Sequence, residues 1–227
     1  MPLFSTLDLV ALTLFLGVWA LYAFALARVE RRQHGLNFEM QRHRGGWMTQ
    51  MLGREMRMVD AQIVSALQNG TAFFASTSLI AVGGALTILR STEEILHVVS
   101  ALPFGIRSTA VQWEAKSIGL AVIFVYAFFK FAWSYRLYNY LAIMIGAAPS
   151  FEQKDTPDAK THAERMAKLC DVAGRHFNRG QRAFFFALGY LGWFLSPWLL
   201  IASTVAVAGV LWRRQFASDS RRALIGE

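Results

Sequence analysis

Two cations, Lys130 and Arg136, are the only charged residues in the apolar stretch 118–148, where an unpaired charge is costly. Six positions separate them, about 240° around a helix, so they point to different faces. Tyr126 and Ser134 lie four residues on either side of Lys130 and share its face. A ring of ammonium groups on that face would attract anions and repel cations, as charged rings do in narrow pores.

These residues predict an ion pathway and, beside it, a structural polar network. The pathway also includes Ser76 and Thr87, which lie on a face of small residues in the apolar stretch 70–89. Two interpretations compete with conduction: small residues let another helix pack closely, and a lysine can extend its ammonium to the lipid headgroups. The expected pathway comprises Lys130, Ser134, Tyr126, Ser76 and Thr87, and the expected network comprises Arg136, Asn139, Gln68, Asn69 and Asp60.

Within the network, the helical rise counted from the inner membrane surface places Gln68 and Asn69 at the same depth as Arg136. Asp60 would lie about 10 Å deeper on the aqueous side. We therefore expect Arg136 to bond toward Gln68 and Asn69 rather than toward Asp60.

The chain holds little that favours catalysis. Glu94 and His97 have the Glu-x-x-His spacing of di-iron bundles, but such bundles need two copies and two further glutamates. His162 and Glu164 have the His-x-Glu spacing of zinc deaminases without their paired cysteines, and Cys170 is the single cysteine. We expect no enzyme activity, no catalytic residue, no metal and no cofactor.

Long apolar stretches must position these side chains. The stretch 70–89 has no charged residue, and about twenty apolar residues of helix cross the roughly 30 Å hydrocarbon layer. Trp113 and Trp133 are about 30 Å apart along a helix and suit the two headgroup levels. The sequence predicts an all-α integral membrane bundle of about four spans, at 7–27, 70–89, 113–135 and 190–212.

The last apolar stretch, 183–212, allows two interpretations. A hairpin at Ser196 and Pro197 would bring the four arginines after Trp212 to the inner side, where positive charge is retained. Each half of that hairpin would have only about fifteen residues, which is too short to cross. We therefore expect a single span, in which Pro197 makes a kink.

Lys and Arg are distributed as in a membrane protein. The chain has 55% hydrophobic residues and a formal net charge of +8, and seven cations lie in each of the segments 28–57 and 154–182. The segment 90–116 has three. Because cations are retained on the cytoplasmic side, both termini are predicted outside. Because membrane topology accounts for the positive charge, we expect no nucleic acid as a partner.

The two cation-rich segments are also predicted to fold as amphipathic helices, at 45–69 and 158–182, from apolar residues that recur at three-to-four-residue spacing. A short interfacial helix is predicted on the outer side at 92–102. The third span continues past the membrane as an apolar helix too hydrophobic to stand alone in water. We expect the two cytoplasmic helices to cover it through Leu141, Ile143, Met144 and Ile145.

Several motifs resemble those of a family of small bacterial membrane proteins, with plant relatives, that is described only as a domain of unknown function. The motifs are Trp47-Met48, Arg54-Glu55-Met56-Arg57, Val59-Asp60-Ala61-Gln62, Asn69-Gly70-Thr71-Ala72-Phe73-Phe74-Ala75-Ser76-Thr77, Phe129-Lys130-Phe131-Ala132-Trp133-Ser134-Tyr135-Arg136 and Tyr138-Asn139-Tyr140. The resemblance spans nearly the whole chain up to Trp212. It implies a multi-pass four-helix protein of the bacterial inner membrane and implies no activity.

Two functional hypotheses follow. Four spans are few for an autonomous carrier, so a conducting protein of this size would form its pore from several copies around an axis. We expect a homo-oligomer in the lipid bilayer that acts as an anion-selective channel or transport unit. The alternative is a non-catalytic structural or accessory subunit of a membrane complex, whose cytoplasmic helices bind a protein partner.

Overall fold

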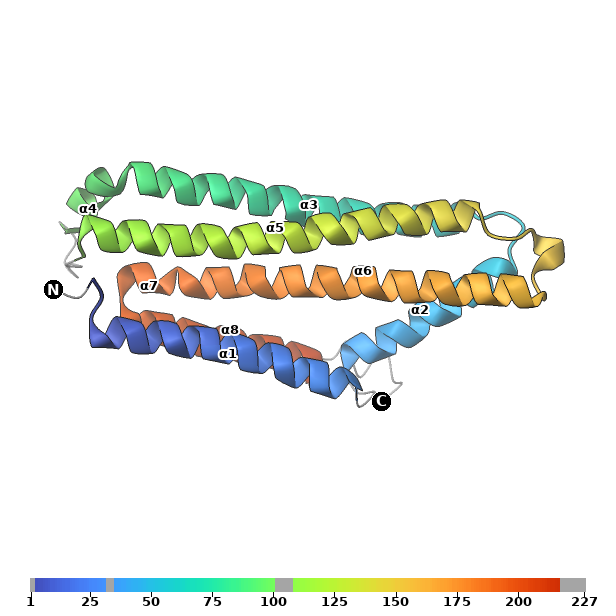
Figure 1. Cartoon of the computed structure of the whole chain (residues 1–227), viewed down its shortest axis with the longest axis horizontal. Coiled ribbons are helices and arrows are strands. Elements are labelled where there is room, and N and C mark those ends of the chain that lie inside the picture. Colours follow the sequence, from blue (N-terminus) through green and yellow to red (C-terminus); the bar gives the residue numbers. More distant parts are fainter. Residues whose placement is uncertain (1–2, 32–34, 101–107, 217–227) are drawn as a thin grey trace.

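The computed structural model describes residues 3–31, 35–100 and 108–216, and within these ranges the secondary structure is helical, without strands. Figure 1 shows the arrangement. In chain order the helices are α1 (Thr6–Arg31), α2 (Leu36–Leu52), α3 (Met58–Arg90), α4 (Thr92–Ser100), α5 (Ala110–Gly146), the 3-10 helix η1 (Phe151–Gln153), α6 (Pro157–Tyr190), α7 (Gly192–Leu195) and α8 (Pro197–Phe216).

Three long helices, α3, α5 and α6, run side by side along the molecule (Figure 1). The shorter α1 and α8 pack against each other at one end, on the other side of α6, and α2 leads from the end of α1 along α6 toward the other end. Among the described residues, three helices are long and apolar enough to cross a membrane: α1 over Thr6–Glu30, α3 and α5. The expectation of a helical membrane protein is thus confirmed at this level.

The interior contains two separate hydrophobic cores. The first core lies at the α1 and α8 end and includes Phe15, Phe131, Phe186 and Trp193. The second core lies at the other end and joins α2, α5 and α6 through residues such as Met48, Leu141 and Met166. Because α3, α5 and α6 contribute to both cores, these three helices connect the ends of the molecule.

The second core confirms the predicted packing around the extension of the third span. Leu141 is fully buried, Ile145 is buried, and Met144 packs at the margin. Ile143 does not take part, since its side chain is 68% exposed on the opposite face of α5.

The predicted helix 45–69 is wrong as a single element. The structure divides it into α2, which starts earlier at Leu36, and the beginning of α3. The chain leaves α2 at Gly53, whose N–H donates to the carbonyl of Gln50, and turns back toward Asp60. Asp60 is fully buried and its Oδ1 accepts bonds from Trp47 Nε1 at 2.7 Å and from Arg54 Nη1 at 2.5 Å. These bonds fasten the turn between the two helices.

The expected continuous span at 190–212 is also not one helix. α6 ends at Tyr190, the chain turns through α7, and α8 starts at Pro197 and runs back along α6 (Figure 1). Pro197 has no N–H to continue the ladder, and Ser196 has an extended backbone at φ −163° while its Oγ accepts from Leu199 N at 3.1 Å. Ser196 and Pro197 are therefore an N-cap and first helical residue, not a kink.

Small residues let α6, α7 and α8 approach closely in this hairpin. A Cβ on Gly192 would lie 2.9 Å from the carbonyl oxygen of Leu199. Ser203 Oγ donates to the carbonyl of Gly189 at 2.6 Å. The tight approach explains why the reversal needs so few residues.

The other predicted elements differ less from the structure. The predicted cytoplasmic helix 158–182 lies within α6, which continues without a break to Tyr190. Its start is capped by Thr156, whose Oγ1 accepts from Ala159 N at 3.2 Å. The predicted interfacial helix 92–102 corresponds to α4, and its residues 101 and 102 lie outside the described part of the chain.

Candidate functional site

Of the residues expected in the ion pathway, the structure keeps Lys130 beside Tyr126 and places the other three apart from this pair. Lys130 is half-buried and its Nζ lies 5.1 Å from the centre of the Tyr126 ring, a cation–π contact. Ser134 is fully buried and donates to the carbonyl of Ala173 at 2.8 Å, which ties α5 to α6 between the two cores. Ser76 and Thr87 lie on an exposed face of α3.

The expected polar network forms in part, with different partners. Gln68 Nε2 donates to Asn139 Oδ1 at 2.6 Å and so links α3 to α5. Arg136 does not bond toward that level, because its Nε donates to the Tyr140 hydroxyl at 2.7 Å along its own helix. Asn69 is exposed, and Asp60 belongs to the turn between α2 and α3.

A stripe of arginines on α6 lines a hollow. Arg175, Arg179 and Arg182 are spaced by four and three residues, so they lie on one face of the helix. Arg44 from α2 and Arg214 from α8 face the same hollow. Guanidinium groups converge here from three helices that are far apart in the sequence.

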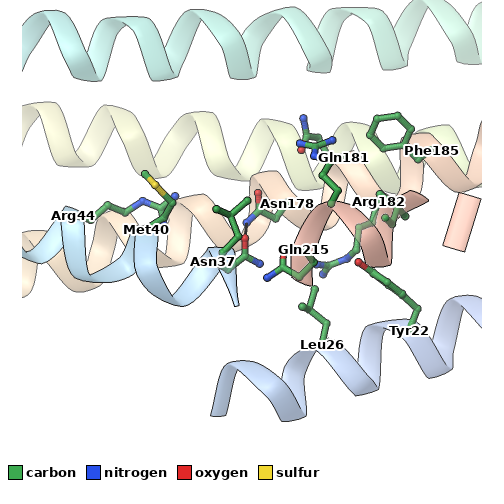
Figure 2. Close-up of a pocket in the computed structure, with 13 residues that line it drawn as sticks. Tyr22, Leu26, Asn37, Met40, Arg44, Asn178, Gln181, Arg182, Phe185 and Gln215 are labelled. Atoms are coloured by element: carbon green, nitrogen blue, oxygen red, sulfur yellow. Dashed lines mark hydrogen bonds between the residues drawn. The ribbon is translucent and has the colours of Figure 1, made fainter. Parts of the chain in front are cut away.

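We name this hollow the basic cleft. Three adjoining pockets that share lining residues make it up. Figure 2 shows its part between α1, α2, α6 and α8, where the polar side chains of Asn37, Asn178, Arg182 and Gln215 gather. The cleft is lined by Trp19, Tyr22, Ala23, Leu26, Ala27, Glu30, Leu36, Asn37, Phe38, Met40, Gln41, Arg44, Tyr126, Asp171, Arg175, Asn178, Arg179, Gln181, Arg182, Phe185, Leu211, Arg214 and Gln215.

A chain of side-chain hydrogen bonds crosses the cleft. Asn178 Nδ2 donates to Asn37 Oδ1 at 3.1 Å, and Asn37 Nδ2 donates to Glu30 Oε1 at 2.7 Å. These two bonds connect α6, α2 and α1. Glu30 accepts from Asn37, and within the described residues it forms no close ion pair with the arginines of the α6 stripe.

Most of the arginines in the cleft form no close ion pair with a carboxylate in the described part of the chain. Arg44 pairs with Asp171 at 3.4 Å. Arg175, Arg179, Arg182 and Arg214 take part in none of the ion pairs found in ranges 3–31, 35–100 and 108–216. Five arginines face two carboxylates, Glu30 and Asp171, which leaves an excess of three positive charges.

Proton uptake by Asp171 would increase this excess. Burial raises the pKa of the Asp171 carboxyl above its ordinary value, although the adjacent Arg44 acts in the opposite direction. The site therefore becomes more attractive to anions as the pH falls.

Sequence reasoning missed the basic cleft because it assigned these arginines to topology alone. The available signal was the spacing of Arg175, Arg179 and Arg182 on a predicted helix, which sets three cations on one face. The contributions of Arg44 and Arg214 depend on the path of α2 and on the α8 hairpin, so no local pattern gives them. For metals, the described residues contain no group of three or more His, Cys, Asp and Glu that could hold an ion.

The fold and the cleft define a helical protein with three helices able to cross a membrane and a basic hollow lined mainly by α1, α2, α6 and α8. A family model described as a protein of unknown function, DUF599, matches residues 10–220, and the chain belongs to this family. The match confirms the resemblance drawn from the sequence and extends it beyond Trp212, where that resemblance ended. No curated protein and no solved structure matches the chain.

Proposed function

We propose that this protein binds a phosphate-bearing anion at the inner surface of the membrane, in the basic cleft. The observation that carries the proposal is the convergence of Arg44, Arg175, Arg179, Arg182 and Arg214 on one hollow with an excess of three positive charges. Guanidinium groups fit phosphate oxygens in a bidentate geometry, and such charge-assisted bonds are the strong ones. We therefore assign to these five arginines the anion preference that the sequence led us to expect at Lys130.

The position of the cleft in the membrane follows from a proposed topology with five crossings. α1, α3, α5 and α8 cross with exposed apolar side chains, among them Phe24, Ile80, Val122 and Val210. The last part of α6 crosses between them, with few of its apolar side chains exposed. α8 then returns to the side on which α1 ends, so Arg213 and Arg214 obey the positive-inside rule that four spans violate.

Cysteine labelling in intact cells tests this topology. We expect Glu93→Cys, in α4, to react with a membrane-impermeant maleimide, and Arg213→Cys, at the end of α8, to react only after the cells are opened. The natural Cys170 gives little background, because it is fully buried and burial raises the pKa of its thiol to about 11. Labelling of Arg213→Cys from outside would restore the four-span topology.

Binding of inorganic pyrophosphate tests the anion site. In non-ionic detergent we expect pyrophosphate to raise the Tm of the protein, and Arg179→Gln/Arg182→Gln to weaken its binding roughly tenfold or more, since a hydrogen bond to a charged group is worth about 1.5–3 kcal/mol. The matched control is Arg42→Gln, an exposed arginine on α2 that pairs with Glu39 outside the cleft. Equal loss in the control, or no binding by the unmodified protein, would overturn the proposal.

Conduction by an oligomer remains a separate hypothesis with its own measurement. A homo-oligomer whose axis passes Lys130 predicts chloride flux in liposomes that changes when Lys130→Glu reverses the charge. Flux that depends on Arg182 and not on Lys130 would instead link conduction to the basic cleft.

A further inference from the structure

We infer that the ligand of the basic cleft is an anionic membrane lipid, and that the buried amide of Gln215 binds its phosphate-containing headgroup. The inference rests on the proposed anion site and adds the chemical class of its ligand. Two observations independent of the arginine charge carry it: the apolar wall of the cleft and the unpaired donor of Gln215.

The apolar wall lies beside the arginines. Leu26 from α1, Phe185 from α6 and Leu211 from α8 line the same part of the cleft as Arg182 and Arg214. A small phosphate compound has no group to cover these side chains, whereas a lipid presents an acyl chain directly below its phosphate. An amphiphile therefore fits both surfaces of the cleft at once.

The cleft adjoins surfaces that would face lipid. Leu21 and Phe24, which flank Tyr22 on α1, are 68% and 63% exposed. Trp212, next to Leu211 on α8, is 48% exposed and its ring centre lies 6.5 Å from that of Tyr22. Tryptophan and tyrosine prefer the headgroup level, so this end of the cleft lies where lipid headgroups are.

Gln215 supplies a donor that the protein leaves unused. Its side chain is buried, 8% exposed, and its Nε2 has no hydrogen-bond partner among the described residues. The neighbouring amides of Asn37 and Asn178 are satisfied by each other and by Glu30. A buried donor that lacks a partner is normally found where a ligand or water completes it.

The surrounding backbone keeps room for this amide. Gly35 has a positive φ of 95°, and a Cβ built on it would lie 3.0 Å from Gln215 Nε2. Figure 2 shows Gln215 directed into the cleft, together with Arg182 and Asn37. With phosphate oxygens held by Arg182 and Arg214, the amide would donate to a remaining oxygen of the headgroup.

Three probes separate a lipid from a free anion: dioctanoyl phosphatidylglycerol, glycerol phosphate and dioctanoyl phosphatidylcholine. In non-ionic detergent, we expect the anionic lipid to displace pyrophosphate at a concentration at least about tenfold below that of glycerol phosphate, because only the lipid covers the apolar wall. The zwitterionic lipid should displace it poorly. Pyrophosphate binding without any advantage for the anionic lipid would overturn the lipid inference and leave the anion site intact.

Variants of Gln215 test the headgroup contact. We expect Gln215→Leu to weaken the anionic lipid about tenfold and Gln215→Glu to weaken it further, because a carboxylate repels phosphate. Gln50→Leu, at an exposed position on α2, is the matched control. An unchanged Tm without ligand shows that the variants are folded, and unchanged lipid affinity in both Gln215 variants would overturn the assignment of Gln215.

Discussion

Asp60→Ala is expected to lower the free energy of unfolding by about 3 kcal/mol, because it breaks a buried ion pair and a hydrogen bond at once. The substitution removes the acceptor of both Trp47 Nε1 and Arg54 Nη1 and leaves the turn between α2 and α3 unfastened. In a thermal unfolding experiment in detergent, this corresponds to a Tm lower by roughly 6–12 °C. Proteolytic cleavage near Gly53 should become faster at the same time.

Glu55→Ala provides the control for this prediction. Glu55 lies in the same turn and is exposed, so its removal should change the free energy of unfolding by less than about 0.5 kcal/mol. If Asp60→Ala has a Tm as high as that of Glu55→Ala, the buried carboxylate does not hold the turn.

Gly180→Val is expected to destabilise the protein by about 1–3 kcal/mol, through overpacking between α5 and α6. A Cβ at this position would lie 2.8 Å from Cε1 of Phe131, whose ring is fully buried in the first core. The ring cannot withdraw into solvent, so the two helices must move apart. Thermal unfolding in detergent measures the effect.

The matched substitution is Gly84→Val on α3. Apart from its chain neighbours and the nearby backbone of α3, no atom of the described residues lies within 4 Å of a Cβ built there, so we expect a change of less than about 0.5 kcal/mol. Equal stability of the two variants would contradict the packing of Gly180 on Phe131. A loss confined to Gly84→Val would indicate that another chain packs on that face of α3.

The parts of the fold that could be predicted are those with a strong local pattern. The stretch 70–89 identified α3, and the tryptophans at 113 and 133 identified the first part of α5. The second core followed from apolar residues at helical spacing, because a helix exposed to water must cover its apolar face. Ile143 was misassigned since consecutive residues cannot all face one side of a helix.

The C-terminal hairpin could not be obtained from a rule about span length. Each half was judged too short because apolar residues alone were counted, whereas α6 gains its length from the amphipathic part before Arg182. Because α6 lies between neighbouring helices, it does not need apolar side chains on every face. Ser196 and Pro197 carried the correct local signal, which is that of a helix start.

The basic cleft needed long-range information. Arg44, Arg182 and Arg214 line one hollow only because α2 returns along α6 and α8 folds back beside α1. Their separation in sequence is too large for any periodicity to report. Lys130, in contrast, has a local signal in the sequence, because it interrupts an apolar stretch.

The hairpin of α6 and α8 has a consequence for biosynthesis. The segment from Arg182 to Trp193 has twelve residues, about 18 Å of helix, and cannot hold itself across a bilayer. It packs against α5 and α1, through Phe184 on Phe124 and Phe186 on Phe15, and against α8, where Ser203 Oγ donates to the carbonyl of Gly189. In the proposed topology, the ribosome must therefore deliver nearly the entire chain before this packing is complete, and a nascent protein truncated before Pro197 would hold that segment in the membrane through α1 and α5 alone.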